Sequence, residues 1–190
     1  MKNFLAKILA VWAAIAFIGS MLIFLLSLWI TGFWSETKRT DLLIKFAKAW
    51  IGTFFILSGI RLTIRGKEKF KTGQNYIVVC NHNSLMDVPI TSPGIPGANK
   101  TIAKSEMAKI PIFNIIYKRG SILVDRKSDA SRRESFNKMK CVLDMGMHMC
   151  IYPEGTRNKT GKPLKEFHDG AFKLAADTGK PLMPAIIFGT

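Results

Sequence analysis

The chain has 190 residues, of which 28 are Lys or Arg and 13 are Asp or Glu, so its formal net charge is +15. Hydrophobic residues make up 48% of the chain, which excludes a disordered basic tail, and the 15 Gly and 8 Pro follow no collagen-type repeat. The three Cys include no C-x-x-C pair, so neither a disulfide framework nor a zinc ribbon is expected, and they fit a reducing compartment.

The first predicted element is a membrane helix, because residues 8–35 carry no charged side chain. About 20 apolar residues are enough to cross the hydrocarbon core as a helix, so this run is long enough to span. Trp12 lies near one end and Trp29 and Trp34 near the other, as aromatic side chains do at membrane interfaces. A cleaved signal peptide is the alternative, but its apolar segment would be about twice the usual length.

A second apolar stretch covers residues 42–60 and is interrupted by Lys45 and Lys48, which share one face of a helix. The uncharged remainder, residues 49–60, is too short to span by itself. We therefore predict an interfacial or re-entrant helix, with a core helix of the following domain as the alternative. Residues 1–60 together form the expected membrane anchor.

Basic residues are more numerous after the first helix than before it. Two precede it and four follow it: Lys2 and Lys7, then Lys38, Arg39, Lys45 and Lys48. Because positive residues stay on the cytoplasmic side, the domain that follows is expected to face the cytoplasm from the inner membrane.

Residues 61–190 are expected to form one α/β domain with a mostly parallel central sheet flanked by helices. Continuous apolar runs, as in strands buried on both faces, predict strands at residues 76–80, 121–124, 149–152 and 184–188. Helical patterns lie between them, at residues 131–147 and 167–178. Strands that alternate with helices are typical of this class.

The domain is basic, with 22 Lys and Arg against 11 Asp and Glu, which favours an anionic partner. It contains no recognisable nucleic-acid-binding motif, so anionic membrane lipids or a phosphorylated substrate are the expected partners and nucleic acid is not. Five residues could suit a soft metal such as Cu(I): Met145, Met147, His148, Met149 and Cys150. Because Met is common in protein cores, we expect no metal site there.

Polar clusters follow three of the predicted strands, at residues 81–87, 125–126 and 153–158. Ligands of open α/β sheets bind beyond the carboxyl ends of the strands, so these loops are expected to converge on one site.

The first cluster contains His82 and Asp87. A turn that leads into a helix could bring the imidazole beside the carboxylate, which is the arrangement of a general base and the group that orients it. The alternative is structural, because Ser84-x-x-Asp87 also has the spacing of a capping box. No nucleophile in a G-x-S-x-G setting is present, so such a base would activate a hydroxyl of the substrate.

The third cluster contains Glu154, Gly155 and Arg157. Gly155 permits a tight turn after a strand, and the planar fork of Arg157 matches a phosphate or carboxylate. An exposed surface turn with an ion pair is the alternative. With Lys100 and Lys104, Arg157 makes a basic set that favours an anionic acceptor.

Four motifs in this order resemble those of the 1-acylglycerol-3-phosphate acyltransferase family. They are Asn81-His82-x4-Asp87, residues 120–126 (G-S-I-L-V-D-R), residues 152–157 (Y-P-E-G-T-R) and residues 183–186 (M-P-A-I). The resemblance covers residues 75–190 and implies a glycerolphosphate acyltransferase-like fold. Tyr152 stands where Phe is more usual in the family, and Met183 where Val is more usual.

The resemblance also implies an activity and its residues. His82 would be the base, Asp87 its orienting partner, and the acceptor would be bound by Glu154, Gly155, Thr156, Arg157 and, near its phosphate, Lys104. The expected reaction moves an acyl group from acyl-CoA or acyl carrier protein to the sn-2 hydroxyl of lysophosphatidic acid, giving phosphatidic acid, with no cofactor beyond the thioester co-substrate.

Two other functions stay open at this point, namely transfer to another lyso-acceptor, such as a lyso-ornithine lipid or another lysophospholipid, and lipid binding without catalysis. Members of the family continue beyond their fourth motif, so we also expect a further segment of the native protein to cover residues 184–188.

Overall fold

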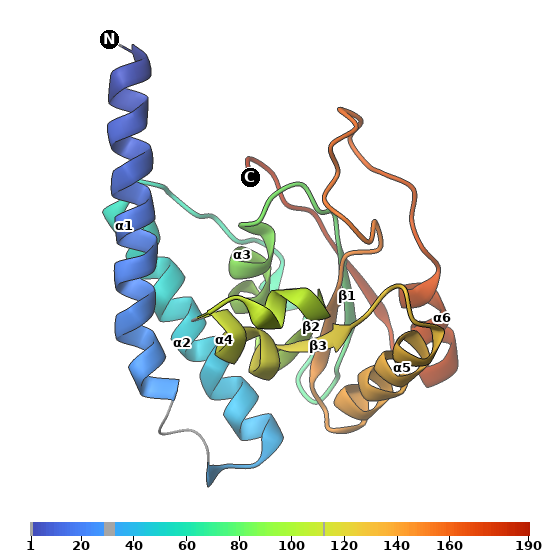
Figure 1. The fold of residues 1–190 in the computed structure, drawn as a ribbon. Helices are drawn as coiled ribbons and strands as arrows, with labels where there is room; N and C mark the ends of the chain where they lie inside the picture. Colours follow the sequence, from blue (N-terminus) through green and yellow to red (C-terminus); the bar gives the residue numbers. More distant parts are fainter. Residues whose placement is uncertain (1, 29–32, 112) are drawn as a thin grey trace.

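The computed structural model describes residues 2–28, 33–111 and 113–190, and its centre is a five-stranded parallel sheet (Figure 1). The strands are β1 (Ile77–Cys80), β2 (Asn99–Lys104), β3 (Ser121–Val124), β4 (His148–Ile151) and β5 (Leu182–Ala185). Their order across the sheet is β3-β2-β4-β1-β5, and every neighbouring pair is parallel. The predicted α/β class with a parallel central sheet is confirmed.

The strand β2 was absent from the sequence-based prediction, because Lys100, Thr101 and Lys104 interrupt its apolar pattern. The structure buries the first two through partners on other elements. The Lys100 ammonium pairs with the Glu36 carboxylate, and the Thr101 hydroxyl lies 2.8 Å from that of Ser121 on β3. Long-range polar pairing therefore makes a buried strand out of a sequence that looks half polar.

The strand β5 runs over Leu182–Ala185, earlier than the predicted residues 184–188. Beyond Ala185 the chain leaves the ladder, since the amide of Ile187 donates to the Asn81 side chain at 2.7 Å instead of to a strand.

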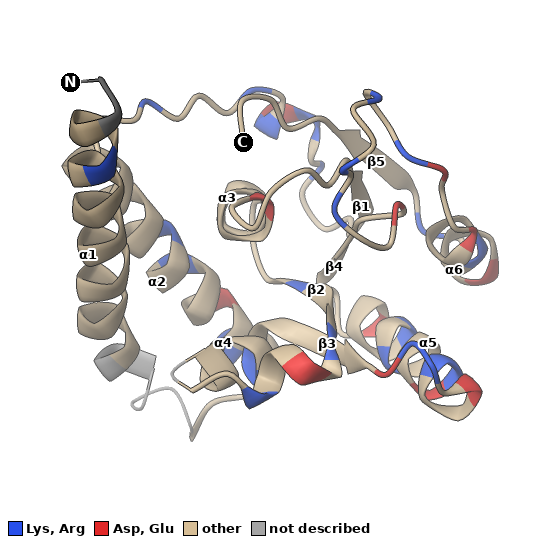
Figure 2. Ribbon diagram, turned by 45° about the horizontal axis from the view of Figure 1, so that its top comes forward, with Lys and Arg blue, Asp and Glu red and all other residues tan. Residues whose placement is uncertain are grey.

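Helices cover both faces of the sheet (Figure 2). One face carries α5 (Asp129–Asp144) and α6 (Gly170–Thr178), and the main core lies between these helices and the sheet. Ser128 caps the start of α5 by accepting a hydrogen bond from the Ser131 amide at 3.2 Å. As predicted, α6 ends at Thr178, and it is followed by the C-cap residue Gly179, whose φ of 64° is left-handed.

The methionine-rich segment around His148 belongs to this interior. Met147, Met149 and Cys150 have no exposed surface, and the core packs around the first two. The described residues contain no group of three or more His, Cys, Asp or Glu side chains that could hold a metal ion.

The other face of the sheet is covered by α3 (Asp87–Gly94) and α4 (Phe113–Gly120), with α2 (Glu36–Leu57) packed against both of these helices. α2 begins earlier than the predicted residues 42–60. Its polar first turn is tied to the domain, because Glu36 pairs with Lys100 of β2. Since α2 also packs along α1, the domain boundary at residue 60 stays a prediction.

The helix α1 (Lys2–Leu28) runs beside α2, and two indole N–H groups join them. Trp12 donates to the Leu57 carbonyl at 2.8 Å, and Trp50 donates to the Phe17 carbonyl at 3.1 Å. From Ala13 onward α1 buries one face, whereas every side chain of residues 4–12 is exposed.

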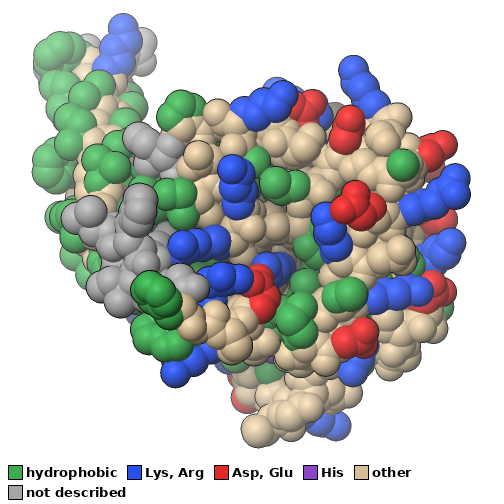
Figure 3. Space-filling model, turned by 60° about the horizontal axis from the view of Figure 1, so that its bottom comes forward, with side chains coloured by type: hydrophobic (Ala, Val, Ile, Leu, Met, Phe, Trp, Pro, Cys, Tyr) green, Lys and Arg blue, Asp and Glu red, His purple; other side chains and the backbone are tan. Residues whose placement is uncertain are grey.

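The exposed part of α1 is apolar apart from Lys7. Figure 3 shows mainly hydrophobic side chains over the projecting end of α1, with a basic side chain near its tip, whereas charged side chains of both signs are scattered over the rest of the visible face. Residues 4–25 form the one described segment long and apolar enough to cross a membrane. The predicted span over residues 8–35 also included residues 29–32, with Trp29, which lie outside the described part of the chain.

Candidate active site

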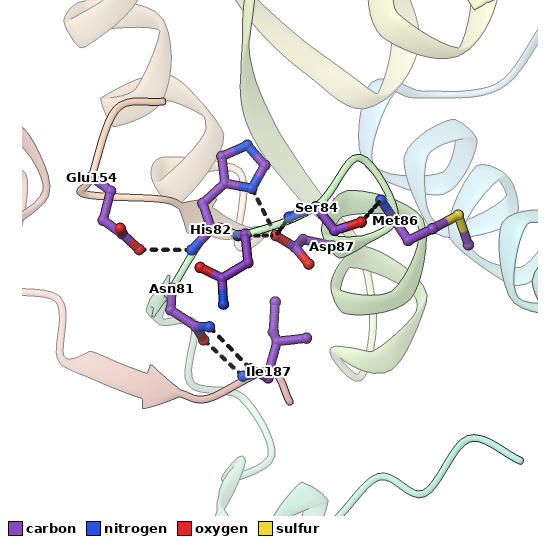
Figure 4. A network of polar contacts seen from close by, with 8 residues as sticks. Asn81, His82, Ser84, Met86, Asp87, Glu154 and Ile187 are labelled. Carbon is purple, nitrogen blue, oxygen red and sulfur yellow. Dashed lines mark hydrogen bonds and ion pairs between the residues drawn. The ribbon is translucent and has the colours of Figure 1, made fainter. Parts of the chain in front are cut away.

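The structure brings His82 and Asp87 together at the carboxyl end of β1 (Figure 4). Asp87 is the first residue of α3, and a short loop separates it from the strand. His82 Nδ1 lies 2.8 Å from Asp87 Oδ2. On a continuous helix two residues five positions apart would point about 140° away from each other, so the loop is what makes the contact possible.

The same carboxylate oxygen organises the loop. Asp87 Oδ2 also accepts hydrogen bonds from the amides of Asn83 at 2.6 Å and Ser84 at 2.8 Å. The Ser84 hydroxyl accepts from the Met86 amide at 3.2 Å and not from that of Asp87, and the residue at the helix N-cap is Met86, whose side chain makes no capping bond. Only one half of the capping box predicted for Ser84 and Asp87 is therefore formed, while the catalytic interpretation stays a prediction.

Asp87 remains ionised at neutral pH. Burial by itself raises the pKa of this fully buried carboxyl, but the hydrogen bonds from His82 and from the loop amides outweigh it and leave the pKa below its ordinary value. An ionised carboxylate only accepts hydrogen bonds, so His82 Nδ1 carries a proton, and in a neutral imidazole of this tautomer the lone pair is on Nε2. The imidazole is 18% exposed, which leaves that lone pair accessible to a substrate.

The backbone of His82 is held on both sides by the loop that follows β4. Its amide donates to Glu154 Oε1 at 2.7 Å, and its carbonyl accepts from the Asn158 amide at 2.6 Å. The second oxygen of Glu154 accepts from the Lys165 amide at 3.0 Å. With no exposed surface and both oxygens bound to backbone amides, Glu154 joins the two loops, and the acceptor contact expected from the resemblance stays a prediction.

The turn after Glu154 requires glycine. Gly155 has a φ of 70°, and a Cβ atom there would lie 2.7 Å from the His168 ring. Its carbonyl accepts a hydrogen bond from the Arg126 guanidinium, which joins the second and third motifs. The predicted tight turn is confirmed, and it places Thr156 and Arg157 on the exposed rim of the site.

The predicted basic set is divided by the structure. Thr156 accepts a hydrogen bond from the Lys165 ammonium at 2.7 Å, and Arg157 is exposed. Lys104 lies at the end of β2 and pairs with Glu106 at 2.8 Å. Lys100 lies near the start of the same strand, is buried and pairs with Glu36, so it is not part of an acceptor site.

Two neighbours of His82 had no assigned role in the sequence analysis. The Asn81 side chain bonds the Ile187 backbone twice, donating to its carbonyl at 3.0 Å and accepting from its amide at 2.7 Å. The Tyr152 ring packs against the imidazole, with centroids 4.5 Å apart. Asn81 lies directly beside His82 in sequence, which was the available signal, whereas nothing in the sequence indicates the contact of Tyr152.

Known proteins resemble this chain in sequence and in fold. A sequence model of the family described as Acyltransferase matches residues 61–188. The 1-acyl-sn-glycerol-3-phosphate acyltransferase of Cocos nucifera is 35% identical over 134 residues, which are 70% of this chain and 42% of that protein. The enzyme of the same name from Borreliella burgdorferi is 32% identical over 70% of this chain and 54% of its own length.

A solved structure resembles the whole chain. The 1-acyl-sn-glycerophosphate acyltransferase PlsC of Thermotoga maritima superposes with a TM-score of 0.80 at 26% identity, covering 100% of this chain and 76% of that one. The chain spans about half the length of the curated relatives it matches. Since the family model covers most of the chain, including the His82–Asp87 pair and the Glu154 loop, the protein belongs to the acyltransferase family.

Proposed function

We propose that the protein transfers a fatty acyl group from a thioester to the sn-2 hydroxyl of lysophosphatidic acid, giving phosphatidic acid. The observation that carries this proposal is the contact between His82 Nδ1 and Asp87 Oδ2 at 2.8 Å, at the sheet edge where ligands bind. The names of the relatives support the choice of acceptor.

The proposed mechanism uses His82 twice. Nε2 takes the proton of the acceptor hydroxyl while its oxygen attacks the thioester carbonyl, and a C–O bond forms. When the tetrahedral intermediate collapses, the C–S bond breaks and the imidazolium returns the proton to the leaving thiolate. Asp87 stabilises the imidazolium between these steps and keeps the ring oriented. The co-substrate is acyl-CoA or acyl-acyl carrier protein, and no other cofactor is proposed.

The acceptor phosphate is proposed to lie at the rim formed by the turn after β4. Arg157 would bind two phosphate oxygens through its fork, with the Gly155–Thr156 backbone and hydroxyl beside it. Lys104, at the end of β2, would add positive charge after exchanging its partner Glu106. The ion pair lowers the pKa of Glu106 to about 2, so that carboxylate is charged whenever it competes for Lys104.

We also propose that the protein is held on the cytoplasmic side of the inner membrane by α1. Residues 4–12 are exposed on every side and extend about 13 Å as a helix, while the outward face of the remaining helix is apolar as well. This end of α1 projects on the side of the molecule where the loop before α3 lies (Figure 1). Lipid around it would bring the lipid acceptor close to His82, and the basic domain would favour anionic headgroups.

Acyl transfer by the purified chain in mixed micelles tests the function. Radiolabelled lysophosphatidic acid is incubated with oleoyl-CoA or with the corresponding acyl carrier protein thioester, and phosphatidic acid is measured. Lysophosphatidylcholine and a lyso-ornithine lipid serve as competing acceptors, and His82→Ala is the inactive control. Phosphatidic acid formed by the wild type alone supports the proposal. Preferred acylation of another acceptor overturns the choice of lysophosphatidic acid, and failure to acylate any acceptor leaves a lipid-binding protein.

A further inference from the structure

A buried polar cluster lies beneath the His82–Asp87 pair. Its members are the second carboxylate oxygen of Asp87, Oδ1, and the hydroxyls of Thr91 and Tyr152. Within the described residues none of these three atoms makes a hydrogen bond of good geometry, and each is closed off from solvent. The Thr190 side chain also approaches the Asp87 carboxylate and helps to lower its pKa. Buried oxygens of this kind are nearly always paired in folded proteins, so three of them beside a catalytic pair require an explanation.

The three groups come from two elements. Thr91 lies one turn after Asp87 on α3, and Tyr152 follows the end of β4. The Tyr152 hydroxyl faces the Thr91 hydroxyl and lies within electrostatic reach of Asp87. On its other side the Tyr152 ring packs against His82 at 4.5 Å between centroids, with 33° between the ring planes. Tyr152 therefore contacts the imidazole with its ring and approaches the carboxylate with its hydroxyl.

We propose that Tyr152 is a positioning residue for the catalytic pair, whose hydroxyl, together with that of Thr91, donates toward Asp87 Oδ1 while its ring fixes the plane of His82. Such second partners commonly fix the orientation and basicity of a functional imidazole–carboxylate pair. The inference rests on the proposed role of His82 as the base. It also gives a function to the hydroxyl that distinguishes Tyr152 from the Phe more usual in the family.

The surroundings keep Tyr152 in its donating form. Burial raises the pKa of Tyr152 well above its ordinary value, so the hydroxyl keeps its proton throughout the working range of pH. The other groups that face the pair include Cys80 of β1, Cys150 of β4, Glu154, and Thr190, whose side chain hydrogen-bonds Asp87. The Cys80 thiol, through a hydrogen bond, and burial raise the pKa of Cys150, so this neighbour also stays neutral.

The charges determine in which direction the proton affinity of the His82–Asp87 pair changes when the donor is removed. A donor on Oδ1 stabilises the state with an ionised Asp87 and a neutral His82 more than the state in which the imidazole is also protonated. Removing the donor therefore raises the affinity of the pair for a proton, and the base is lost at a higher pH.

The test is Tyr152→Phe, which keeps the ring and removes only the hydroxyl. We expect the protonation midpoint of the pair, followed through the NMR signal of the His82 Cε1–H, to rise by about half a pH unit. The acid limb of the kcat profile should move with it, so that kcat on that limb falls about threefold. KM for both substrates should stay unchanged. Thr91→Val should act in the same direction, and the double variant should show less than the sum of the two effects.

Tyr76→Phe is the matched control. The Tyr76 hydroxyl bonds Gln74 at 2.9 Å just before β1, at the strand end opposite His82, so its loss should alter stability without moving the midpoint. An NMR midpoint and a kcat profile that superimpose for wild type and Tyr152→Phe overturn the inference, as does a change in melting temperature alone. The NMR titration does not depend on turnover, so a wild type that transfers no acyl group would defeat the proposed function while the midpoint still decides the role of Tyr152.

Discussion

Replacing Glu154 by Gln tests whether Glu154 holds the two loops together or binds the acceptor. The Glu154 carboxylate accepts two backbone hydrogen bonds, from His82 at 2.7 Å and from Lys165 at 3.0 Å, and has no exposed surface. Gln keeps one accepting oxygen, but its amide group then faces the other backbone N–H, so one bond is lost and two donors confront each other.

The loss of stability in Glu154→Gln can be calculated from these contacts. A hydrogen bond to a charged group contributes about 1.5–3 kcal/mol. For a chain of this length each kcal/mol corresponds to about 2–4 °C, so the melting temperature of Glu154→Gln should fall by roughly 3–12 °C. Because the amide of His82 is one of the two donors, the base should lose its position, and kcat should fall roughly 10- to 100-fold. KM for lysophosphatidic acid should change less than about twofold, since uniform acceptor binding is untouched.

The assay combines thermal denaturation in detergent with initial rates over a range of acceptor concentrations. Glu166→Gln is the matched control, because it makes the same charge change at an exposed carboxylate of the same loop and should leave all three quantities unaltered. A Glu154→Gln protein with normal melting temperature and normal kcat but a strongly raised KM for lysophosphatidic acid would refute the reasoning and return Glu154 to the acceptor site.

Other substitutions test the remaining parts of the site. His82→Ala should abolish turnover with little loss of thermal stability, and near-normal kcat would end the assignment of the base. Arg157→Ala should raise KM for lysophosphatidic acid roughly 10-fold or more and Arg157→Lys should recover part of it, because Lys keeps the charge without the fork; equal effects on the donor KM would contradict this. Lys100→Met should lower the free energy of unfolding by about 1–2 kcal/mol, because Glu36 loses a buried partner. The loss is limited because Glu36 is partly exposed and keeps its ion pair with Arg39. An unchanged denaturation curve would exclude the pairing of Lys100 with Glu36. The folded-state pKa of Asp87 lies below the ordinary 3.8, so the contribution of Asp87 to stability is present above pH 3.8 and is lost as the pH falls through the folded-state pKa. Asp87→Asn should therefore flatten the acid dependence of the free energy of unfolding, measured by denaturation from pH 2 to 6.

Several features of the site were predictable because their signals are local. The strand β3 was predicted with its observed bounds, since an apolar run at residues 122–124 follows Ser121 and lies between a glycine and a charged pair. The pairing of His82 with Asp87 was expected from their spacing around a turn, and the short loop and helix start realise it. Gly155 was recognised from its place directly after a strand, and its φ of 70° is the conformation that such a turn requires.

The roles that the sequence left open depend on partners far away in the chain. The resemblance implied that Glu154 binds the acceptor, but its carboxylate bonds the amide of His82, 72 residues away, and has no exposed surface. Lys100 looked like a member of the basic set, but Glu36, 64 residues earlier, pairs with it inside the fold. The strand β2 was missed for the same reason.

The difference between the features that the sequence predicted and those that it left open has one physical cause. Apolar periodicity, turn residues and closely spaced motifs act over a few residues, so the amino-acid sequence by itself determined the α/β class, the apolar first helix and the position of the His82–Asp87 pair. Burying a charged or polar group is favourable only where a partner satisfies it, and that partner is chosen by the packing of the whole chain. The tertiary structure alone therefore decided that Glu154 holds the loops, that Lys100 anchors α2, and that Tyr152 lies between His82 and α3.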